Sequence, residues 1–270
     1  MNYKVGFIGV GNIANAIISG IIEAGGYSKN DIYLYDIDNI KRDMYKKEGF
    51  NVVKSEAEVA KQVNIVFLTI KPADLKTVLE RISPVITLEN VLVSVVAGIS
   101  ISFIKNILGK ECKVVRAMPN TPLLVGSGAT AIAYEMPITY AELNCVKSIF
   151  ETAGVIEVLP EDKMNEVISV NGSGPAYVYL LAKAMIDGAV SQGIDADIAK
   201  RLAVETIIGS ARMITVTGEP IEDLIKKVCS PNGTTIKAVE QLEKRSFEQV
   251  VGDAMLSCTK RAYQLEKELE

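Results

Sequence analysis

The chain has 270 residues, 49% of them hydrophobic, and a formal net charge of −4. This length suits one large domain or two of ordinary size, and the slight negative charge offers no basic surface for nucleic acid. The sequence contains no histidine. That excludes Ser-His-Asp and Cys-His catalysis, most zinc sites and dehydrogenases that use an imidazole as acid or base, so we expect no metal site.

The N-terminal residues, MNYKVGFIGVG, enter an apolar strand pattern at once and do not resemble a secretory signal. The longest apolar stretch, 174–190, is interrupted by Lys183 and Asp187, so we expect no membrane-spanning helix. The cysteines stand alone in the sequence, at Cys112, Cys145, Cys229 and Cys258. Isolated thiols are typical of a reducing compartment, and we therefore expect a cytoplasmic protein.

Up to about residue 160, strand patterns alternate with helix patterns. Strands are predicted at 4–9, 31–36, 51–53, 64–70, 91–96, 112–117, 128–134 and 155–160. Helices are predicted at 12–24, 37–48, shortly after 53, from 72, from 100 and at 139–152. This alternation indicates an α/β fold, a doubly wound parallel sheet with helices on both faces.

From about residue 161, helix patterns take over, with glycine-rich breaks between them. The segment 175–192 is apolar almost all round, which is typical of a helix buried on every side. A small helical domain cannot bury such a helix alone, so we expect it to pack against a second subunit. We therefore divide the chain into domains 1–160 and 161–270.

Residues 9–14, GVGNIA, form a G-x-G-x-x-A motif between a strand pattern and a helix pattern. The first glycine permits a tight turn, the second lets the backbone approach a pyrophosphate, and the alanine lets the helix pack closely on the strand. The motif predicts a Rossmann-type dinucleotide site, and the alternative is a tight turn that binds nothing. The contacts would come from Ile8, Gly9, Val10, Gly11, Asn12 and Ile13.

Asp36 ends the second predicted strand. A carboxylate there can accept a hydrogen bond from the 2′-hydroxyl of the adenine ribose and would repel the 2′-phosphate of NADP, which favours NADH weakly. The alternative is a helix N-cap, for which Asp38 is equally well placed. Lys41 and Arg42 follow and can still hold a phosphate, so the choice between NADPH and NADH stays open.

Six segments resemble a known family: VGFIGVGNIA (5–14), TIKP (69–72), VVAGI (95–99), RAMPNTP (116–122), NGSGPAYVY (171–179) and SPNGTT (230–235). In this order, from residue 3 to about 260, they closely resemble the pyrroline-5-carboxylate reductases. The resemblance implies a Rossmann domain followed by an all-α dimerisation domain, with rings of five dimers in some members. It also implies NAD(P)H-dependent reduction of a cyclic imine to L-proline, the last step of proline biosynthesis.

Three positions depart from the family pattern. Asn232 replaces a loop glycine, and Asn tolerates the left-handed conformation better than other residues that carry a side chain. Asn171 replaces a serine. Glu56 stands where the family often has Asn near the adenosine, which adds a second acidic group and reinforces the weak preference for NADH.

The resemblance assigns the remaining site residues. Further cofactor contacts fall on Glu56, Thr69, Ile70, Lys71, Pro72, Val96, Ala97, Gly98, Met118, Pro119 and Asn120. Substrate contacts fall on Asn120, Thr121, Ser173, Gly174, Ser230, Gly233, Thr234 and Thr235. The catalytic candidates are Thr235 and Lys71, although Lys71 is alternatively a solvated charge at a strand end.

The implied reaction explains the missing histidines. A protonated cyclic imine accepts hydride at its carbon, so positioning and electrostatics replace a strong general base. By resemblance, loop 230–235 surrounds the substrate carboxylate with backbone amides of Gly233, Thr234 and Thr235. The alternative is a turn between helices in which Ser230 and the threonines cap helix ends.

Two other classes stay open. A β-hydroxyacid dehydrogenase would use the same architecture with a catalytic lysine, for which Lys183 is the candidate, but it leaves loop 230–235 unexplained. A nucleotide-sensing module would bind the cofactor without turnover. Either way, we expect a small-molecule ligand and neither nucleic acid nor membrane as partner.

Overall fold

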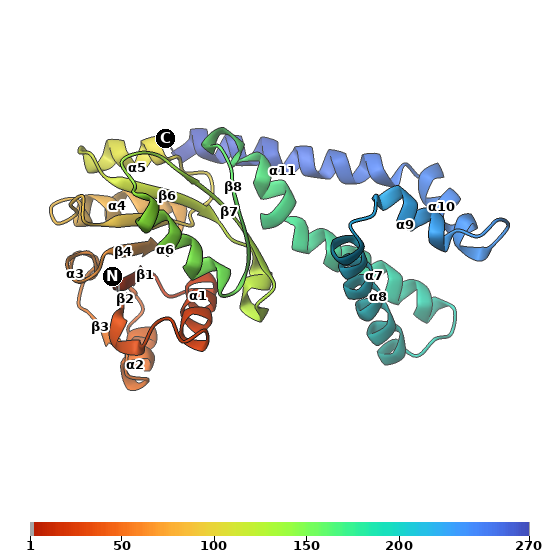
Figure 1. The fold of residues 1–270 in the computed structure, drawn as a ribbon, viewed down its shortest axis with the longest axis horizontal. Coiled ribbons are helices and arrows are strands. Elements are labelled where there is room, and N and C mark those ends of the chain that lie inside the picture. Colours follow the sequence, from red (N-terminus) through yellow and green to blue (C-terminus); the bar gives the residue numbers. More distant parts are fainter. Residues whose placement is uncertain (1–2, 270) are drawn as a thin grey trace. The chain divides into compact units, whose positions relative to one another are not determined.

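The structure is a computed structural model that describes residues 3–269. The chain divides into two compact units (Figure 1). The first unit is the chain up to Ser173 together with the segment from Cys258 onward, and the second is Gly174–Ser257. The sequence-based domain boundary after residue 160 stays a prediction.

The first unit contains an eight-stranded sheet in the order β3-β2-β1-β4-β5-β6-β7-β8. The strands are β1 (Val5–Ile8), β2 (Ile32–Tyr35), β3 (Asn51–Val52), β4 (Ile65–Leu68), β5 (Val91–Ser94), β6 (Lys113–Met118), β7 (Gly128–Tyr134) and β8 (Gly154–Val158). Every predicted strand is present. The sheet is parallel as predicted except between β6 and β7, which are antiparallel. A short connection containing the 3₁₀ helix η2 (Thr121–Val125) turns the chain back there, whereas a parallel neighbour needs a long crossover.

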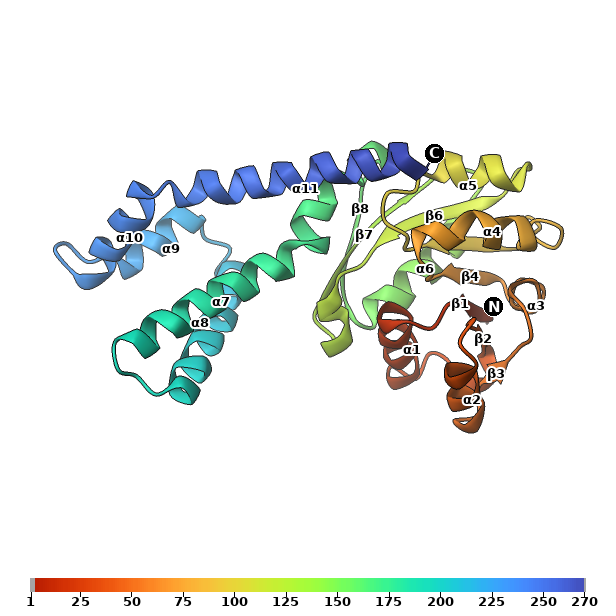
Figure 2. The ribbon, with the colours of Figure 1, turned by 180° about the vertical axis from the view of Figure 1, so that it is seen from behind.

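Helices cover both faces of this sheet, as Figures 1 and 2 show. One face carries α1 (Asn12–Glu23), α2 (Asn39–Lys47) and α6 (Tyr140–Glu151). The other carries α3 (Glu56–Gln62), α4 (Pro72–Ile82) and α5 (Ile101–Leu108). The predicted doubly wound arrangement is therefore confirmed.

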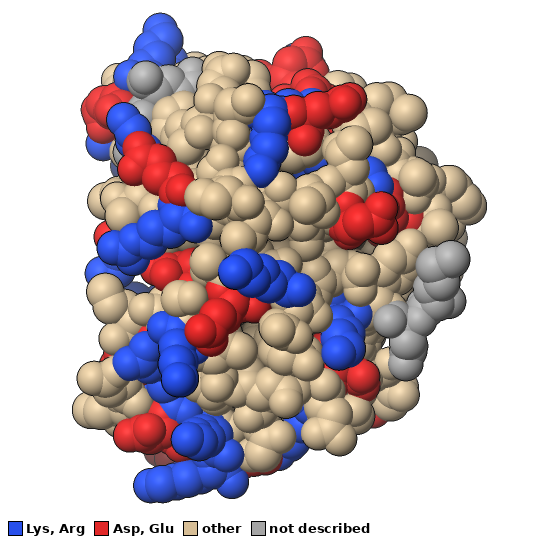
Figure 3. Space-filling view, turned by 90° about the vertical axis from the view of Figure 1, so that its left-hand side faces the viewer, with Lys and Arg blue, Asp and Glu red and all other residues tan. Residues whose placement is uncertain are grey.

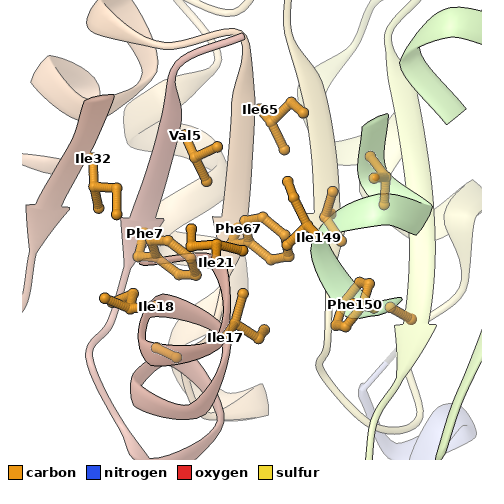
Figure 4. Packing of buried hydrophobic residues seen from close by; sticks show 14 of the residues in the cluster. Val5, Phe7, Ile17, Ile18, Ile21, Ile32, Ile65, Phe67, Ile149 and Phe150 are labelled. Carbon is orange, nitrogen blue, oxygen red and sulfur yellow. The ribbon is translucent and has the colours of Figure 1, made fainter. Parts of the chain in front are cut away.

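The two cores follow from the alternation of side chains along each strand. Val5 and Phe7 of β1 belong to the core under α1 and α6, and Ile8 belongs to the core under α4. In the first core, Phe7 stacks on Phe67 with ring centroids 4.8 Å apart, and Phe67 meets Phe150 of α6 edge-on at 5.7 Å (Figure 4). Strands that are apolar on both sides are thus sealed from water on both sides.

After the sheet, the chain forms the 3₁₀ helix η3 (Glu161–Lys163) and the π-helical turn η4 (Ile168–Gly172). The second unit then follows with α7 (Gly174–Ser191), α8 (Ala196–Thr217), α9 (Ile221–Val228) and α10 (Thr234–Lys244). The last helix, α11 (Phe247–Leu269), begins in the second unit and ends in the first. The first unit therefore includes residues from the C-terminal end of the sequence.

A buried arginine holds the end of α11 in the first unit. Arg116 of β6 is 2% exposed and donates from Nη2 to Oδ1 of Asn165 at 2.7 Å. Its Nη1 lies 3.7 Å from a carboxylate oxygen of Glu161 and 3.8 Å from one of Glu266. Asn165 also donates to Glu266 at 2.6 Å, and Glu161 accepts from the amide of Ile101 at 2.6 Å. The network thus joins β6, η3 and the start of α5 to the end of α11.

Helix α11 makes two further contacts in the first unit, one with Glu166 and one with the loop after β5. Tyr263 donates its hydroxyl to Glu166 at 2.9 Å, and this hydrogen bond raises the pKa of Tyr263. A side chain at Gly98 would stand 3.4 Å from the backbone of Glu266 and from Cβ of Leu265. The C-terminal helix therefore lies directly against the turn that contains Gly98.

The second unit leaves much apolar surface uncovered. Helix α7 has no buried residue, and Tyr179 and Leu180 are 62% and 67% exposed. Its apolar character was predicted correctly, but within one chain this helix is not buried. Contiguous apolar surface of this kind marks a place where another protein surface packs.

The first unit has a mixed surface. On the side that Figure 3 shows, Lys and Arg lie beside Asp and Glu, and no broad area carries one sign of charge. Within residues 3–269, none of the helices has the length and hydropathy needed to cross a membrane.

Replacing Arg116 by Ala should strongly destabilise the first unit. Removing one partner of a buried charge network leaves the other charges uncompensated, which costs about 3–5 kcal/mol of unfolding free energy. Urea unfolding followed by circular dichroism measures this change. The matched control is Arg261→Ala on α11, because Arg261 pairs with Glu268 in solvent, and the control should leave the midpoint nearly unchanged. Equal midpoints for the two variants would contradict the role of Arg116.

Candidate functional site

The glycine turn between β1 and α1 is fixed by its two neighbouring strands. The amide of Gly9 donates to the carbonyl of Tyr35 at 2.7 Å, and the Thr69 hydroxyl donates to the carbonyl of Gly9 at 2.6 Å. Gly9 has φ +91, and a Cβ there would lie 2.7 Å from the Thr69 carbonyl oxygen. Only glycine fits this position, because both the backbone conformation and the space exclude a side chain.

The start of α1 is open to a ligand. Gly11 is the N-cap of α1, and no atom lies within 4 Å of the place where its Cβ would stand. The first turn of α1 contains no acidic residue, and the first amides of a helix have no carbonyl partner within it. Ala14 is fully buried at the same end. A helix start of this kind attracts phosphate groups.

This turn opens into a cavity of about 740 Å³, the size of a small-molecule site. Many predicted cofactor residues line it: Ile8, Gly9, Gly11, Asp36, Glu56, Thr69, Ile70, Lys71, Pro72, Val96 and Ala97. Other predicted cofactor residues lie outside the lining: Val10, Asn12, Ile13, Gly98, Met118, Pro119 and Asn120. The structure therefore brings together the segments that follow β1, β2, β3, β4 and β5 at the carboxyl edge of the sheet, where ligands of such folds bind.

The predicted site residues Met118 and Asn120, at the end of β6 and just after it, form hydrogen bonds within the protein. Asn120 is 9% exposed, and its Oδ1 accepts from the amide of Ala129 at 2.9 Å. Asn171 donates to the carbonyl of Met118 at 2.6 Å and to that of Ala129 at 3.1 Å. Asn171, which departs from the family pattern, thus ties the π-helical turn η4 to both strands of the antiparallel pair.

Asp36 has more partners than a ribose-binding role requires. Its carboxylate accepts from the amide of Val10 at 2.7 Å and from that of Asp38 at 2.9 Å, and Nζ of Lys41 lies 3.5 Å away. Asp38 itself is the N-cap of α2. Asp36 therefore fixes the glycine turn in addition to lining the cavity.

Glu56 is paired as well. It is 7% exposed at the start of α3, and its Oε1 accepts from Nη1 of Arg81 at 2.8 Å. The weak preference for NADH assumed free negative charges at Asp36 and Glu56. Because both carboxylates have cationic partners, that argument loses most of its force.

The sequence analysis missed one wall of the cavity. Asp74, Thr77, Val78 and Arg81 of α4 line it together. These positions are i, i+3, i+4 and i+7, so they lie on one face of the helix. The helical period of the segment after TIKP is the signal that would have found them. Lys41 also lines the cavity, whereas Arg42 donates to Asn39 beside it on α2.

Loop 230–235 forms a tight turn at the start of α10 in the second unit. Asn232 has φ 60, and the amide of Gly233 donates to the carbonyl of Ser230 at 2.9 Å. Pro at the second position and positive φ at the third are the features of a type II turn. Asn232 therefore adopts the left-handed conformation expected for it. The amide of Gly233 donates within the turn and is not available to a ligand. The amides of Thr234 and Thr235, in the first turn of α10, are the ones that remain to bind an anion.

At Gly233, crowding by Ser230 rather than the backbone angle disfavours a side chain. Its φ is −76, and a Cβ would stand 2.5 Å from the hydroxyl oxygen of Ser230 and 3.0 Å from the Ser230 carbonyl oxygen. Thr234 is exposed and Thr235 is half-buried. The loop thus presents backbone donors next to a threonine hydroxyl.

The other candidates have defined places. Lys71 is the exposed N-cap of α4 and lines the cavity. Thr121 is exposed at the start of η2. Ser173 lies next to Gly174, the first residue of α7, and its hydroxyl is 3.1 Å from the Cys258 sulfur. Lys183 forms an exposed ion pair with Asp187 on α7, one helical turn away.

Removing the Asp36 carboxylate should weaken the binding of both NADH and NADPH. In Asp36→Ala the amides of Val10 and Asp38 lose their acceptor, which costs about 1–3 kcal/mol for a buried donor, or roughly 5- to 150-fold in the dissociation constant. Quenching of bound NADH and NADPH fluorescence measures both constants. The control is Asp43→Ala at an exposed position on α2. Unchanged constants in Asp36→Ala would show that the turn holds its shape without this carboxylate.

Two family profiles match separate parts of the chain. Residues 4–98 match the family described as NADP oxidoreductase, coenzyme F420-dependent. Residues 161–265 match the family described as pyrroline-5-carboxylate reductase dimerisation. The first match contains most of the residues that line the cavity, and the second contains the loop at the start of α10.

Known proteins resemble the chain over nearly its full length. The pyrroline-5-carboxylate reductase of Escherichia coli is 37% identical over 99% of this chain and 100% of its own. That of Pisum sativum is 33% identical over 98% of this chain and 96% of its own. The Plasmodium falciparum pyrroline carboxylate reductase with NADP bound has a TM-score of 0.89 at 30% identity over 98% of both chains. The pyrroline-5-carboxylate reductase of Coxiella burnetii has a TM-score of 0.91 at 31% identity over 98% of this chain and 99% of its own. This chain therefore belongs to the pyrroline-5-carboxylate reductase family.

Proposed function

We propose that the chain is an NAD(P)H-dependent oxidoreductase that reduces the C=N bond of 1-pyrroline-5-carboxylate to give L-proline, the last step of proline biosynthesis. The observation that carries this proposal is the fixed glycine turn of residues 9–11, which opens into a cavity of about 740 Å³. The family relationship supports the imine as substrate. A chain without histidine suits a reaction that needs no strong base.

The lining of the cavity supports the assignment of each part of the cofactor to a particular group of residues. The open space at Gly11 and the first-turn amides of α1 fit a pyrophosphate. Asp36 directly follows β2, the position at which doubly wound folds bind the adenine ribose. Segments 69–72 and 96–98 would hold the second ribose and the nicotinamide. The bound cofactor supplies a hydride.

The substrate carboxylate is the group that loop 230–235 suits. The amides of Thr234 and Thr235 begin α10, and a helix start favours an anion through its unpaired donors and its dipole. The turn at Asn232 brings the Ser230 hydroxyl close to Gly233 on the same loop. Asn120, Thr121, Ser173 and Gly174 stay as further proposed substrate contacts.

Two residues are proposed to act near the reacting atoms. The Thr235 hydroxyl would donate a hydrogen bond to the imine nitrogen or the carboxylate. The Lys71 ammonium, at the carboxyl edge of β4, would balance negative charge in the cavity. Neither residue removes a proton from carbon, because the imine carbon only gains a hydride. Their contribution is positioning and charge.

We further propose residues 1–160 as the dinucleotide-binding domain and residues 161–270 as the dimerisation and substrate domain. The family matches at 4–98 and 161–265 support this division. The dimerisation match and the exposed apolar residues of α7 support a homodimer. We also propose that five such dimers assemble into a ring. A reducing cytoplasm would suit the free thiols of Cys112, Cys145, Cys229 and Cys258.

The test of the function is a spectrophotometric assay of 1-pyrroline-5-carboxylate with NADH and with NADPH. We expect imine-dependent oxidation of the cofactor and formation of proline. A β-hydroxyacid substrate serves as the comparison, because a dehydrogenase of that class would use Lys183, which here is paired with Asp187 in solvent. Cofactor binding without turnover of any imine would instead support a sensing module.

Changes in loop 230–235 should damage turnover and spare cofactor binding. In Gly233→Val, the new side chain collides with Ser230, so the catalytic efficiency with the imine should fall at least about 100-fold. In Thr235→Ala, the loss of one donor made chiefly in the transition state should cost roughly 2–4 kcal/mol in kcat. Steady-state kinetics and a cofactor dissociation constant measure the two effects separately.

The control for these loop variants is Lys237→Ala, which removes an exposed charge from α10 that pairs with Glu240. Thermal melts confirm that each variant is folded. Near-normal turnover in both Gly233→Val and Thr235→Ala would contradict the proposed role and support the alternative, that the loop is only a turn between helices.

The protein should be at least a dimer at micromolar concentration. Light scattering should give a mass of twice the 29.2 kDa chain or more. Leu180→Glu places a charge on the exposed apolar surface of α7 and should shift the mass downward without loss of helix content. A monodisperse wild-type species at the chain mass would contradict the proposed assembly.

A further inference from the structure

Each of the two buried carboxylates in the cavity is paired with a cation that is more exposed. The Asp36 and Lys41 side chains are 10% and 41% exposed, with 3.5 Å between Oδ2 and Nζ. The Glu56 and Arg81 side chains are 9% and 57% exposed, with 2.8 Å between Oε1 and Nη1. In both pairs the cation is therefore the partner that is more accessible to an anion from solvent.

The two pairs lie at the adenosine end of the site. In doubly wound folds, the residue at the end of the second strand reads the ribose 2′ position. Here Asp36 follows β2, and Glu56 comes after β3, the strand that pairs with β2 in the sheet. All four residues line the same cavity. The 2′ substituent is what distinguishes NADP(H) from NAD(H), so these pairs are placed to read it.

Arg81 is better suited to a phosphate than Lys41. A guanidinium has five N–H donors in a planar fork and binds phosphate in a bidentate way, whereas an ammonium acts as a point charge. The hydrogen bond to Glu56 uses Nη1. It fixes the side chain against a buried anchor and leaves the other edge of the fork for a second anion. The helix neighbours of Arg81 at Thr77 and Val78 line the cavity too, so Arg81 lies on the cavity side of α4.

We propose that Arg81 is a specificity-determining residue of the cofactor site. Anchored on Glu56 through Nη1, it binds the 2′-phosphate of NADP(H) with its remaining donors. With NAD(H), which has no 2′-phosphate, Arg81 keeps only its contact with Glu56. The two cofactors therefore differ in their dependence on this residue. This inference rests on the proposed use of NAD(P)H, and it names the residue that distinguishes the two forms.

The test uses the full-length protein and two fragments, 2′,5′-ADP and 5′-AMP, which differ by the 2′-phosphate. In Arg81→Gln, the dissociation constant of 2′,5′-ADP should rise about 10-fold, because a charge-assisted contact to phosphate is lost. That of 5′-AMP should stay within about 2-fold. Isothermal titration calorimetry measures both constants without any turnover.

The matched control is Lys76→Gln, which removes an exposed positive charge from the same helix at a position that does not line the cavity. It should leave both fragment constants unchanged. If Arg81→Gln weakens the two fragments equally, or weakens neither, the proposal is overturned. If Lys76→Gln has the same effect as Arg81→Gln, the general charge of α4 is responsible and the proposal is also overturned.

Kinetics with 1-pyrroline-5-carboxylate give a second readout. The ratio of kcat/KM for NADPH to that for NADH should fall about 10-fold in Arg81→Gln and stay constant in Lys76→Gln. A wild-type protein that reduces no imine with either cofactor would refute the proposed function. The fragment constants would still decide the role of Arg81.

Discussion

The buried guanidinium of Arg116 is the constraint on which much of the first unit depends. An arginine stays charged in the interior of a protein, so its surroundings must supply compensating groups. The nearest carboxylates belong to Glu161 and Glu266, and the bridging amide belongs to Asn165. This requirement draws the last turns of α11 onto the sheet, although α11 begins in the other unit. The same helix end lies against the turn at Gly98, which comes directly after the cavity-lining residues Val95, Val96 and Ala97.

The cavity is shaped by groups that serve the fold and the ligand together. Thr69 and Asp36 hold the glycine turn through its carbonyls and amides, and both line the cavity. A ligand therefore meets a backbone that is already fixed, and it does not have to order the turn when it binds. The carboxylates of Asp36 and Glu56 in the cavity are already paired with Lys41 and Arg81. Counting acidic residues alone therefore does not predict cofactor choice, and in our proposal the unused donors of Arg81 decide it.

Local sequence determined the features that depend on near neighbours. The continuous apolar run of β1 predicted a strand buried on both faces, because side chains of a strand point alternately to opposite sides. The motif at 9–14 gave the turn and the open helix start. Asn232 in the sequence Ser-Pro-Asn-Gly gave the left-handed residue of the type II turn. The absence of histidine excluded catalysis that depends on an imidazole, and the resemblance of the six motifs to a family implied hydride transfer to an imine.

Tertiary structure alone decided the partners of the buried charges of Arg116 and Glu56. Arg116 meets Asn165 across 49 positions, and Asn165 meets Glu266 across 101. The pairing of Glu56 with Arg81 and the antiparallel join of β6 and β7 likewise depend on how separate elements pack. Propensity and periodicity act over a few residues, so the sequence by itself determined the elements, the glycine turn and the family. Long-range contacts have no local signature, because any of several acidic residues could satisfy a buried cation, and only the folded chain selects which one does.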